Sequence, residues 1–288
     1  MKKGILYALL TAVLFVTLEP VSKLIASDIT PYAMTFWRFF VGSILLMPFA
    51  AVKMKKENLK ITGKDVVRMT LLGTLCICIS MVFLQVAVKK AEAPSLIAII
   101  FSSNSVFTII FSAILMKEKL TKNKIIALAL GVIGVVLCAD FKSGANISSV
   151  ALALASALSF SLYTVLNQKY KSKVGGIVQT AGAFFMGSVV LLVVLLVAKI
   201  PVIPQLDAGG IWIMLYLAFF VTGLGYVAYF GAIDAGGAIM ASLAFFIKPI
   251  LTPFVTWIVN GIVPDVMVFV SVAFIVGASY FAVYRKTK

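Results

Sequence analysis

The sequence predicts an all-α membrane protein with about ten transmembrane helices. Of its 288 residues, 62% are hydrophobic and only 12% are charged, whereas a soluble domain is roughly half apolar and about a quarter charged. The apolar residues form continuous runs long enough to cross a bilayer, and they do not alternate with polar residues as in a membrane β-barrel. These observations favour a bundle of membrane-spanning helices.

Each expected helix is one apolar run of about 20 residues, the length that crosses a hydrocarbon core at about 1.5 Å per residue. Short polar loops separate the runs. We place the spans at residues 4–26, 31–50, 67–88, 93–116, 122–140, 147–169, 177–198, 209–231, 236–258 and 264–284.

Lysine and arginine are distributed unequally between the two sides of this bundle. One side carries Lys2, Lys3, Lys55, Lys56, Lys60, Lys64, Lys117, Lys119, Lys122, Lys124, Lys169, Lys171, Lys173, Arg285, Lys286 and Lys288, and the other carries Lys89, Lys90, Lys142 and Lys199. Because cytoplasmic loops are enriched in basic residues, we expect both termini on the cytoplasmic side of the cell membrane. The same distribution accounts for the net charge of +15 without a domain that binds nucleic acid.

Three charged residues are the clearest charges deep within expected spans, where a charge is costly and marks a functional site. They are Glu19 in the first span, Arg38 in the second and Lys248 in the ninth. Glu19 and Arg38 each lie roughly 10 Å from the same membrane face, so we expect them to form an ion pair with a role in coupling or gating. Lys23, one turn beyond Glu19, is a competing partner.

Two prolines accompany these charges. Pro20 follows Glu19, and a proline in a transmembrane helix frees a backbone carbonyl that neighbouring helices or water must satisfy. We expect Pro20 to be the bend that lets the first span open and close. Pro249 follows Lys248 and weakens the helical hydrogen bonding beside it. Both prolines are therefore candidate gating residues on helices that face a polar path.

The chain also contains an internal repeat with an offset of about 144 residues. The segment Tyr7–Phe15 resembles Ala151–Ser159. We therefore divide the chain into residues 1–143 and 144–288, each with five expected spans. An odd number of spans reverses the direction of the chain, so the halves are expected to be inverted repeats (5+5). This is a transporter architecture with a binding site near the bilayer midplane.

Under this repeat, polar residues occur at matched depths in both halves. Glu19 corresponds to Tyr163, and Ser103 with Asn104 in the fourth span corresponds to Lys248 in the ninth. Polar groups in matched positions suit a central cavity with one gate on each side.

Four short motifs resemble those of one transporter family. They are Arg38-Phe39, the stretch Ala87–Ala93, the turn Met116-Lys117-Glu118-Lys119-Leu120-Thr121, and Lys248-Pro249. The turn resembles Leu-Gly-Glu-Arg-Leu-Thr of the EamA-type transporters in the drug/metabolite transporter superfamily, and Lys248-Pro249 stands where that family usually has Glu-Pro or Ser-Pro. The resemblance covers nearly the whole chain. It implies an alternating-access carrier of small metabolites such as amino acids, often an exporter.

Two substrate classes fit the expected cavity. If the other two intramembrane charges pair, Lys248 remains free to hold a carboxylate or phosphate, and Asn104, Ser103 and Tyr163 supply hydrogen bonds. The alternative is a cationic or quaternary-amine compound held by Glu19 and by aromatic faces. The candidate aromatic residues are Trp37, Tyr163, Tyr226, Tyr229 and Trp257. Glu19 is also the main buried acid, which makes proton coupling a hypothesis.

Other functions are less consistent with this sequence. It contains no histidine, which removes the commonest metal ligand and general base. We therefore expect no metal, no cofactor and no enzymatic activity. A channel or a passive lipid scramblase remains as an alternative to a carrier. The expected partners are a small-molecule substrate, protons and the lipid bilayer, with the protein as a monomer or a homodimer.

Overall fold

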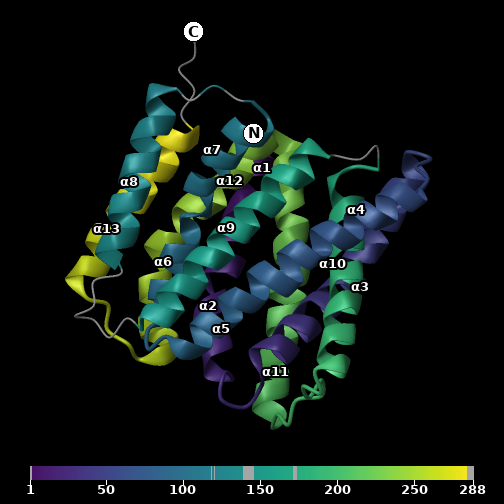
Figure 1. Cartoon of the computed structure of the whole chain (residues 1–288), viewed down its shortest axis with the longest axis horizontal. Helices are drawn as coiled ribbons and strands as arrows, with labels where there is room; N and C mark the ends of the chain where they lie inside the picture. Colours follow the sequence, from purple (N-terminus) through teal and green to yellow (C-terminus); the bar gives the residue numbers. More distant parts are fainter. Residues whose placement is uncertain (1, 118, 120, 139–145, 171–173, 284–288) are drawn as a thin grey trace.

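The computed structural model describes residues 2–117, 119, 121–138, 146–170 and 174–283, which form helices joined by short loops (Figure 1). Within this part of the chain, seven helical stretches are long and apolar enough to cross a membrane. They are Lys3–Leu24, Pro31–Lys56, Gly63–Lys90, Pro94–Leu115, Ile147–Lys169, Gly176–Val197 and Ala208–Ala232. The all-helical membrane class predicted from composition is therefore confirmed.

The helices begin and end close to the expected limits. Their bounds are α1 (Lys2–Val16), α2 (Leu18–Leu24), α3 (Pro31–Lys56), α4 (Gly63–Gly73), η1 (Thr74–Met81), α5 (Val82–Lys90), α6 (Pro94–Ser102), α7 (Asn104–Leu115), α8 (Lys122–Cys138), α9 (Ile147–Lys169), α10 (Gly176–Val197), α11 (Ala208–Tyr216), η3 (Leu217–Leu224), α12 (Gly225–Asn260) and α13 (Val266–Val283). Here η1 and η3 are π-helical segments.

Several residues used in the sequence interpretation lie outside the described residues. They are Glu118 and Leu120 of the family-like turn and the basic residues Lys142, Lys171, Lys173, Arg285, Lys286 and Lys288.

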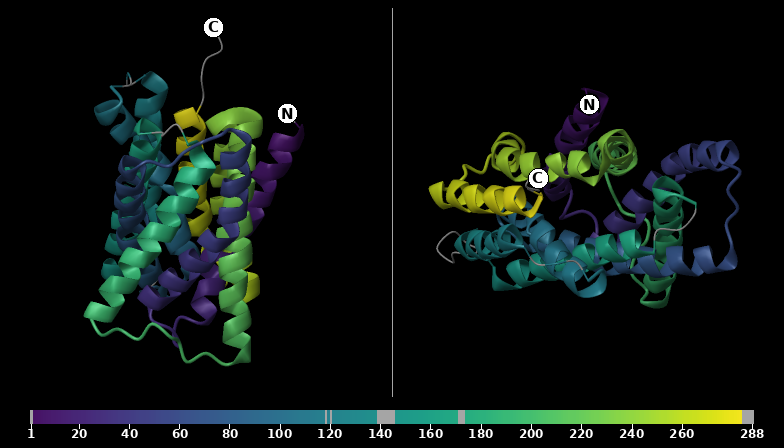
Figure 2. Two further views of the ribbon diagram at one scale, coloured as in Figure 1. Left: turned by 90° about the vertical axis from the view of Figure 1, so that its right-hand side faces the viewer. Right: turned by 90° about the horizontal axis from the view of Figure 1, so that it is seen from above.

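The stretch between the eighth and ninth expected spans differs from the prediction. We expected a loop between residues 231 and 236, but α12 keeps a helical backbone from Gly225 to Asn260. Seen from above, α12 is bent, and its middle part lies across the molecule between two upright arms (Figure 2). A bent helix therefore makes the change of direction that we assigned to a loop.

The first span is interrupted at Thr17, between α1 and α2. Pro20 has no N–H to donate to the carbonyl of Val16, and its ring crowds the same turn. The Thr17 hydroxyl donates to the Leu14 carbonyl at 2.8 Å and lies 2.9 Å from the Tyr216 hydroxyl. The bend expected from Pro20 is therefore present as a break one turn earlier.

The fourth span is interrupted at Ser103, between α6 and α7. Around this position the hydroxyls of Ser102 and Ser103 and the side-chain amide of Asn104 all donate to carbonyls of the preceding turn. Such side chains compete with backbone N–H groups for the same acceptors and weaken the helix locally.

The two π-helical segments occupy related places in the chain. η1 lies in the third expected span of the first half, and η3 lies in the third expected span of the second half. A π-helical turn is wider than an α-helical turn, and such turns occur frequently at functional sites. Both segments contribute to the cavity described below.

Helices from the two halves also pack in matched combinations. α1 packs on α12 as α9 packs on α6 and α7, and α3 packs on η3 as α10 packs on η1. α3 also packs on α10, and α8 packs on α13. Corresponding helices of the two halves therefore make similar contacts with the opposite half.

The contact between α4 and α10 depends on glycine. A Cβ atom added at Gly73 would stand 2.0 Å from the Ala183 carbonyl oxygen and 2.8 Å from the Gly187 backbone nitrogen. Without side chains at these positions, the two helix backbones approach closely, as small residues allow in membrane bundles.

We predict that Gly73→Ala separates α4 from α10 and lowers the apparent melting temperature of the purified protein. Overpacking of this kind typically destabilises by about 1–3 kcal/mol. Gly63→Ala is the matched control, because a Cβ atom at Gly63 meets nothing within 4 Å. The melting temperatures of both variants are measured by thermal unfolding in detergent, monitored by size-exclusion chromatography. Equal melting temperatures for the two variants would contradict the close contact.

Candidate functional site

A cavity lies at the contact between the two halves of the chain. Helices of the first half supply its residues Phe15, Leu18, Arg38, Met81, Leu84 and Phe101, and helices of the second half supply Phe160, Val221, Thr222, Tyr226, Tyr229 and Lys248. The cavity is small: its water-accessible volume is about 40 Å³, which is room for a few waters. A solute larger than a few waters would therefore require the cavity to widen.

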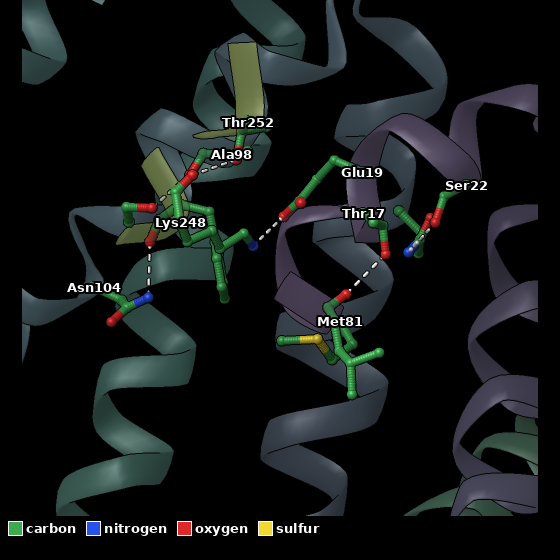
Figure 3. Close-up of polar contacts among 12 residues, drawn as sticks. Thr17, Glu19, Ser22, Met81, Ala98, Asn104, Lys248 and Thr252 are labelled. Atoms are coloured by element: carbon green, nitrogen blue, oxygen red, sulfur yellow. Dashed lines mark hydrogen bonds and ion pairs between the residues drawn. The ribbon is translucent and has the colours of Figure 1, made fainter. Parts of the chain in front are cut away.

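One wall of the cavity is held by a buried ion pair between Glu19 and Lys248. The Lys248 Nζ lies 2.7 Å from the Glu19 Oε1 (Figure 3). Glu19 is 0% exposed and Lys248 only 3% exposed, so the pair is withdrawn from both water and lipid. It joins α2, near the start of the chain, to α12, near its end.

The expected ion pair between Glu19 and Arg38 is therefore wrong. The expectation treated the first two spans as neighbours because a short loop joins them. In the structure, α2 packs against α5, α6 and α12, so Glu19 meets the lysine of α12. Lys248, which we expected to be free for a substrate anion, is the group that neutralises Glu19.

Arg38 is the cavity cation that makes no salt bridge among the described residues, although the Glu19 carboxylate lies close enough to act on it electrostatically. Its side chain is only 2% exposed, and Nε and Nη1 make no hydrogen bond. Its remaining contacts are weak: Nη2 donates to the Met81 sulfur at 3.6 Å, and the guanidinium carbon lies 4.8 Å from the centre of the Phe39 ring. The main correction to the sequence interpretation is that Lys248, and not Arg38, pairs with Glu19.

Lys23, the competing partner considered for Glu19, has a different role. Its ammonium donates to the backbone carbonyls of Val88, Lys89 and Ala91 at 3.3, 3.0 and 2.5 Å. These carbonyls belong to the end of α5 and the residue after it, where helical N–H partners run out and a cation is favoured. Lys23 therefore ties α2 to the end of α5.

The other predicted substrate-binding residues do not all reach the cavity. Ser103 and Asn104 lie next to its wall at Phe101, but both side chains donate to helix carbonyls. Tyr163 is 5% exposed and packs in the hydrophobic core against Phe160. These three residues help to shape the surroundings of the cavity.

Trp37 lies elsewhere. Its indole N–H donates to the Val202 carbonyl at 2.8 Å, and its ring lines a separate, apolar surface pocket. Trp257 is 52% exposed and does not line the cavity either. Of the aromatic residues considered for a cation, Tyr226 and Tyr229 do line it.

The two candidate gating prolines flank the ion pair. Pro20 follows Glu19, and the side-chain amide of Asn260 donates to the Pro20 carbonyl at 3.1 Å. Pro249 follows Lys248 inside α12, and the Thr252 hydroxyl donates to the Lys248 carbonyl at 2.7 Å (Figure 3). Each charged residue is therefore followed by a proline, which has no N–H to donate to the helical hydrogen bonding of the preceding turn.

Most of the aromatic wall was missed by the sequence interpretation. Phe15, Phe101 and Phe160 line the cavity together with Met81. Each is an apolar residue within an apolar run, so neither hydropathy nor spacing distinguishes it from a residue that faces lipid or core. Only the contact between the two halves brings these side chains together.

Fold and cavity define a multi-spanning helical membrane protein with charged groups at its centre. The family model described as "EamA-like transporter family" matches residues 2–139 and again residues 147–284. A relative from Clostridium kluyveri, named "Uncharacterized transporter", is 34% identical over 96% of this chain and 91% of its own length. The Bacillus subtilis "Uncharacterized transporter YyaM" is 26% identical over 80% of this chain and 77% of its own length.

The fold itself also occurs among solved structures. One crystal structure is similar with a TM-score of 0.69 at 17% identity, covering 98% of this chain and 96% of the other. The chain belongs to the EamA-like transporter family, as its motifs suggested, and it is a membrane transporter.

We predict that removing either partner of the buried ion pair destabilises the protein more than removing both. Glu19→Gln leaves the Lys248 ammonium buried and unpaired, and Lys248→Met does the same to the Glu19 carboxylate. Each loss of a partner costs about 3–5 kcal/mol in a buried pair. The double variant leaves neither residue of the pair charged and recovers most of this loss. Melting temperatures of the four proteins test the prediction, and additive effects of the two changes would contradict it.

Proposed function

We propose that this transporter is a secondary carrier that exports a small organic solute across the cell membrane by alternating access. One observation carries the proposal: a charged cavity is enclosed between two similar halves of the chain. Intramembrane charges that face a cavity are typical of substrate and ion paths, and a site between structural repeats is typical of secondary transporters.

Three observations support an inverted repeat of residues 1–143 and 144–288. The same family model matches each half once, η1 and η3 lie at related positions, and the helix pairs across the halves match. With five spans in each half, the halves would run in opposite directions through the membrane. The excess of Lys and Arg in one set of loops favours cytoplasmic termini.

The contacts of α2 suggest which face of the carrier is closed. Lys23 binds the end of α5, and Asn260 at the end of α12 binds the Pro20 carbonyl. Both contacts lie at the end of the bundle that carries few basic residues, which we assign to the outside. We infer a state in which α2 closes the outer side of the cavity and opening requires these hydrogen bonds to break.

We also propose proton coupling, on the basis of the ion pair. The Glu19 Oε2 atom is buried and has no hydrogen-bond partner. Protonation of Glu19 would remove its charge and weaken the 2.7 Å contact with Lys248, which would loosen α2 from α12. Binding of a proton at Glu19 would therefore allow α2, the helix that closes the cavity, to move.

The aromatic wall favours one alternative, a carrier of cationic compounds. Phe101 lies 5.5 Å from the Lys248 ammonium, so at least one aromatic face already meets a cation. However, Glu19, the acid that would hold such a substrate, is engaged by Lys248 and does not line the cavity. We therefore place the anionic or neutral solute first.

We predict saturable, pH-gradient-driven transport by the purified protein in liposomes loaded with a panel of labelled metabolites. Glu19→Gln/Lys248→Met, which keeps the pair neutral, should still exchange substrate across the membrane but should no longer respond to the imposed gradient. Glu57→Gln is the control, because Glu57 is an exposed acid at the end of α3.

Flux that does not saturate, or bursts of electrical conductance, would instead indicate a channel. A double variant that responds to the gradient as strongly as the unchanged protein would remove Glu19 from the coupling step.

A further inference from the structure

We propose that Arg38 binds the negative charge of the substrate, and that the substrate is an organic monoanion with an apolar or aromatic body. This deepens the proposed carrier function and rests on it, because it assumes that the cavity is the transport site. The inference is carried by three features of the cavity: an unpaired guanidinium, its balance of charge and the chemistry of its wall.

The guanidinium is the first feature. Arg38 lines the cavity with two of its three nitrogens, Nε and Nη1, lacking any hydrogen-bond partner. Buried polar groups are almost always satisfied, so an unsatisfied buried charge calls for an explanation. A carboxylate accepts two parallel hydrogen bonds from adjacent guanidinium nitrogens, and such bonds are about twice as strong as those between neutral groups.

The balance of charge is the second feature. Glu19 and Lys248 neutralise each other across 2.7 Å, so Arg38 leaves the cavity with one uncompensated positive charge. A substrate with one negative charge would make the site neutral. A dianion would leave an excess negative charge in a low-dielectric environment, where an unpaired charge is strongly disfavoured.

The wall is the third feature. Apart from Arg38, Lys248, Thr222 and the hydroxyls of Tyr226 and Tyr229, the cavity is lined by apolar and aromatic groups. The Thr222 hydroxyl donates to the Leu217 carbonyl of its own helix. A polar sugar or a highly hydroxylated substrate would find few partners here, whereas an apolar or aromatic body would be buried against matching surfaces.

A zwitterionic amino acid fits less well than a plain carboxylate. Its ammonium group would need an acceptor, and the free oxygen of Glu19 belongs to a residue that does not line the cavity. The ammonium would also restore the uncompensated positive charge. The proposal therefore ranks a carboxylate above the amino acid with the same side chain.

Four probes with closely related carbon skeletons separate the substrate classes. They are 3-phenylpropanoate, phenylalanine, 3-phenylpropylamine and 3-phenylpropanol, which are anionic, zwitterionic, cationic and neutral. Binding to the purified full-length protein is measured by calorimetry and by the shift in melting temperature. We expect 3-phenylpropanoate to bind most tightly. Tightest binding of the amine or of the neutral alcohol would overturn the proposal.

Variants then assign the binding to Arg38. Arg38→Gln should weaken binding of 3-phenylpropanoate on the order of 30-fold, as expected for loss of hydrogen bonds between charged groups. Arg38→Lys keeps the charge but loses the paired donors. Its affinity for 3-phenylpropanoate should therefore lie between those of the unchanged protein and Arg38→Gln. Arg68→Gln is the matched control, because Arg68 is exposed on α4 and its loss should leave the affinity unchanged.

Stability without ligand provides a second readout. Because Arg38 makes no salt bridge and two of its nitrogens make no hydrogen bond, Arg38→Gln should raise the melting temperature of the ligand-free protein, in contrast to Lys248→Met, which breaks a pair. A marked loss of stability would show that Arg38 has a structural partner and would overturn the proposal.

The same proteins distinguish this inference from the carrier function. Binding that depends on Arg38, without transport in liposomes, would support the site and contradict the carrier. Transport of a solute that is unaffected by Arg38→Gln would support the carrier and overturn the assignment of Arg38.

Discussion

The interior of this protein depends on how three charges are accommodated within a membrane. A carboxylate and two cations lie at the centre of the bundle, where unpaired charges are costly. Two of them are joined at 2.7 Å between α2 and α12, so the first and ninth expected spans must pack together. Neighbours along the chain therefore separate, and helices far apart in sequence come into contact. We propose that the third charge, Arg38, binds a ligand.

The irregular backbone of the protein gathers around this arrangement. The breaks at Thr17 and Ser103, Pro249 of α12 and both π-helical segments all adjoin the cavity or the ion pair. Within a membrane, irregular backbone is tolerated where protein or water satisfies its polar groups. Here side chains and neighbouring helices do so. The same features that make room for charges also supply places where helices can bend.

Class, helix positions and family could be predicted from the sequence because they depend on hydropathy, length and short motifs. The three intramembrane charges were also found in this way, since a charge within an apolar run is conspicuous. Their pairing could not be predicted, because the depth of Glu19 and Arg38 says nothing about which helix α2 packs against. The aromatic residues of the wall were missed for the same reason: Phe15, Phe101 and Phe160 acquire their role only through packing between the halves.

The most direct test of this account is to measure which cation is bonded to Glu19. Solid-state NMR of the protein in lipid bilayers can detect dipolar coupling between the Glu19 carboxyl carbon and side-chain nitrogens, with Glu19→Gln used to assign the signal. The account predicts the strong coupling of a directly hydrogen-bonded pair between Glu19 and a lysine Nζ, which disappears in Lys248→Met. Coupling between Glu19 and an arginine nitrogen would contradict it and would return Lys248 to the role of the free cation.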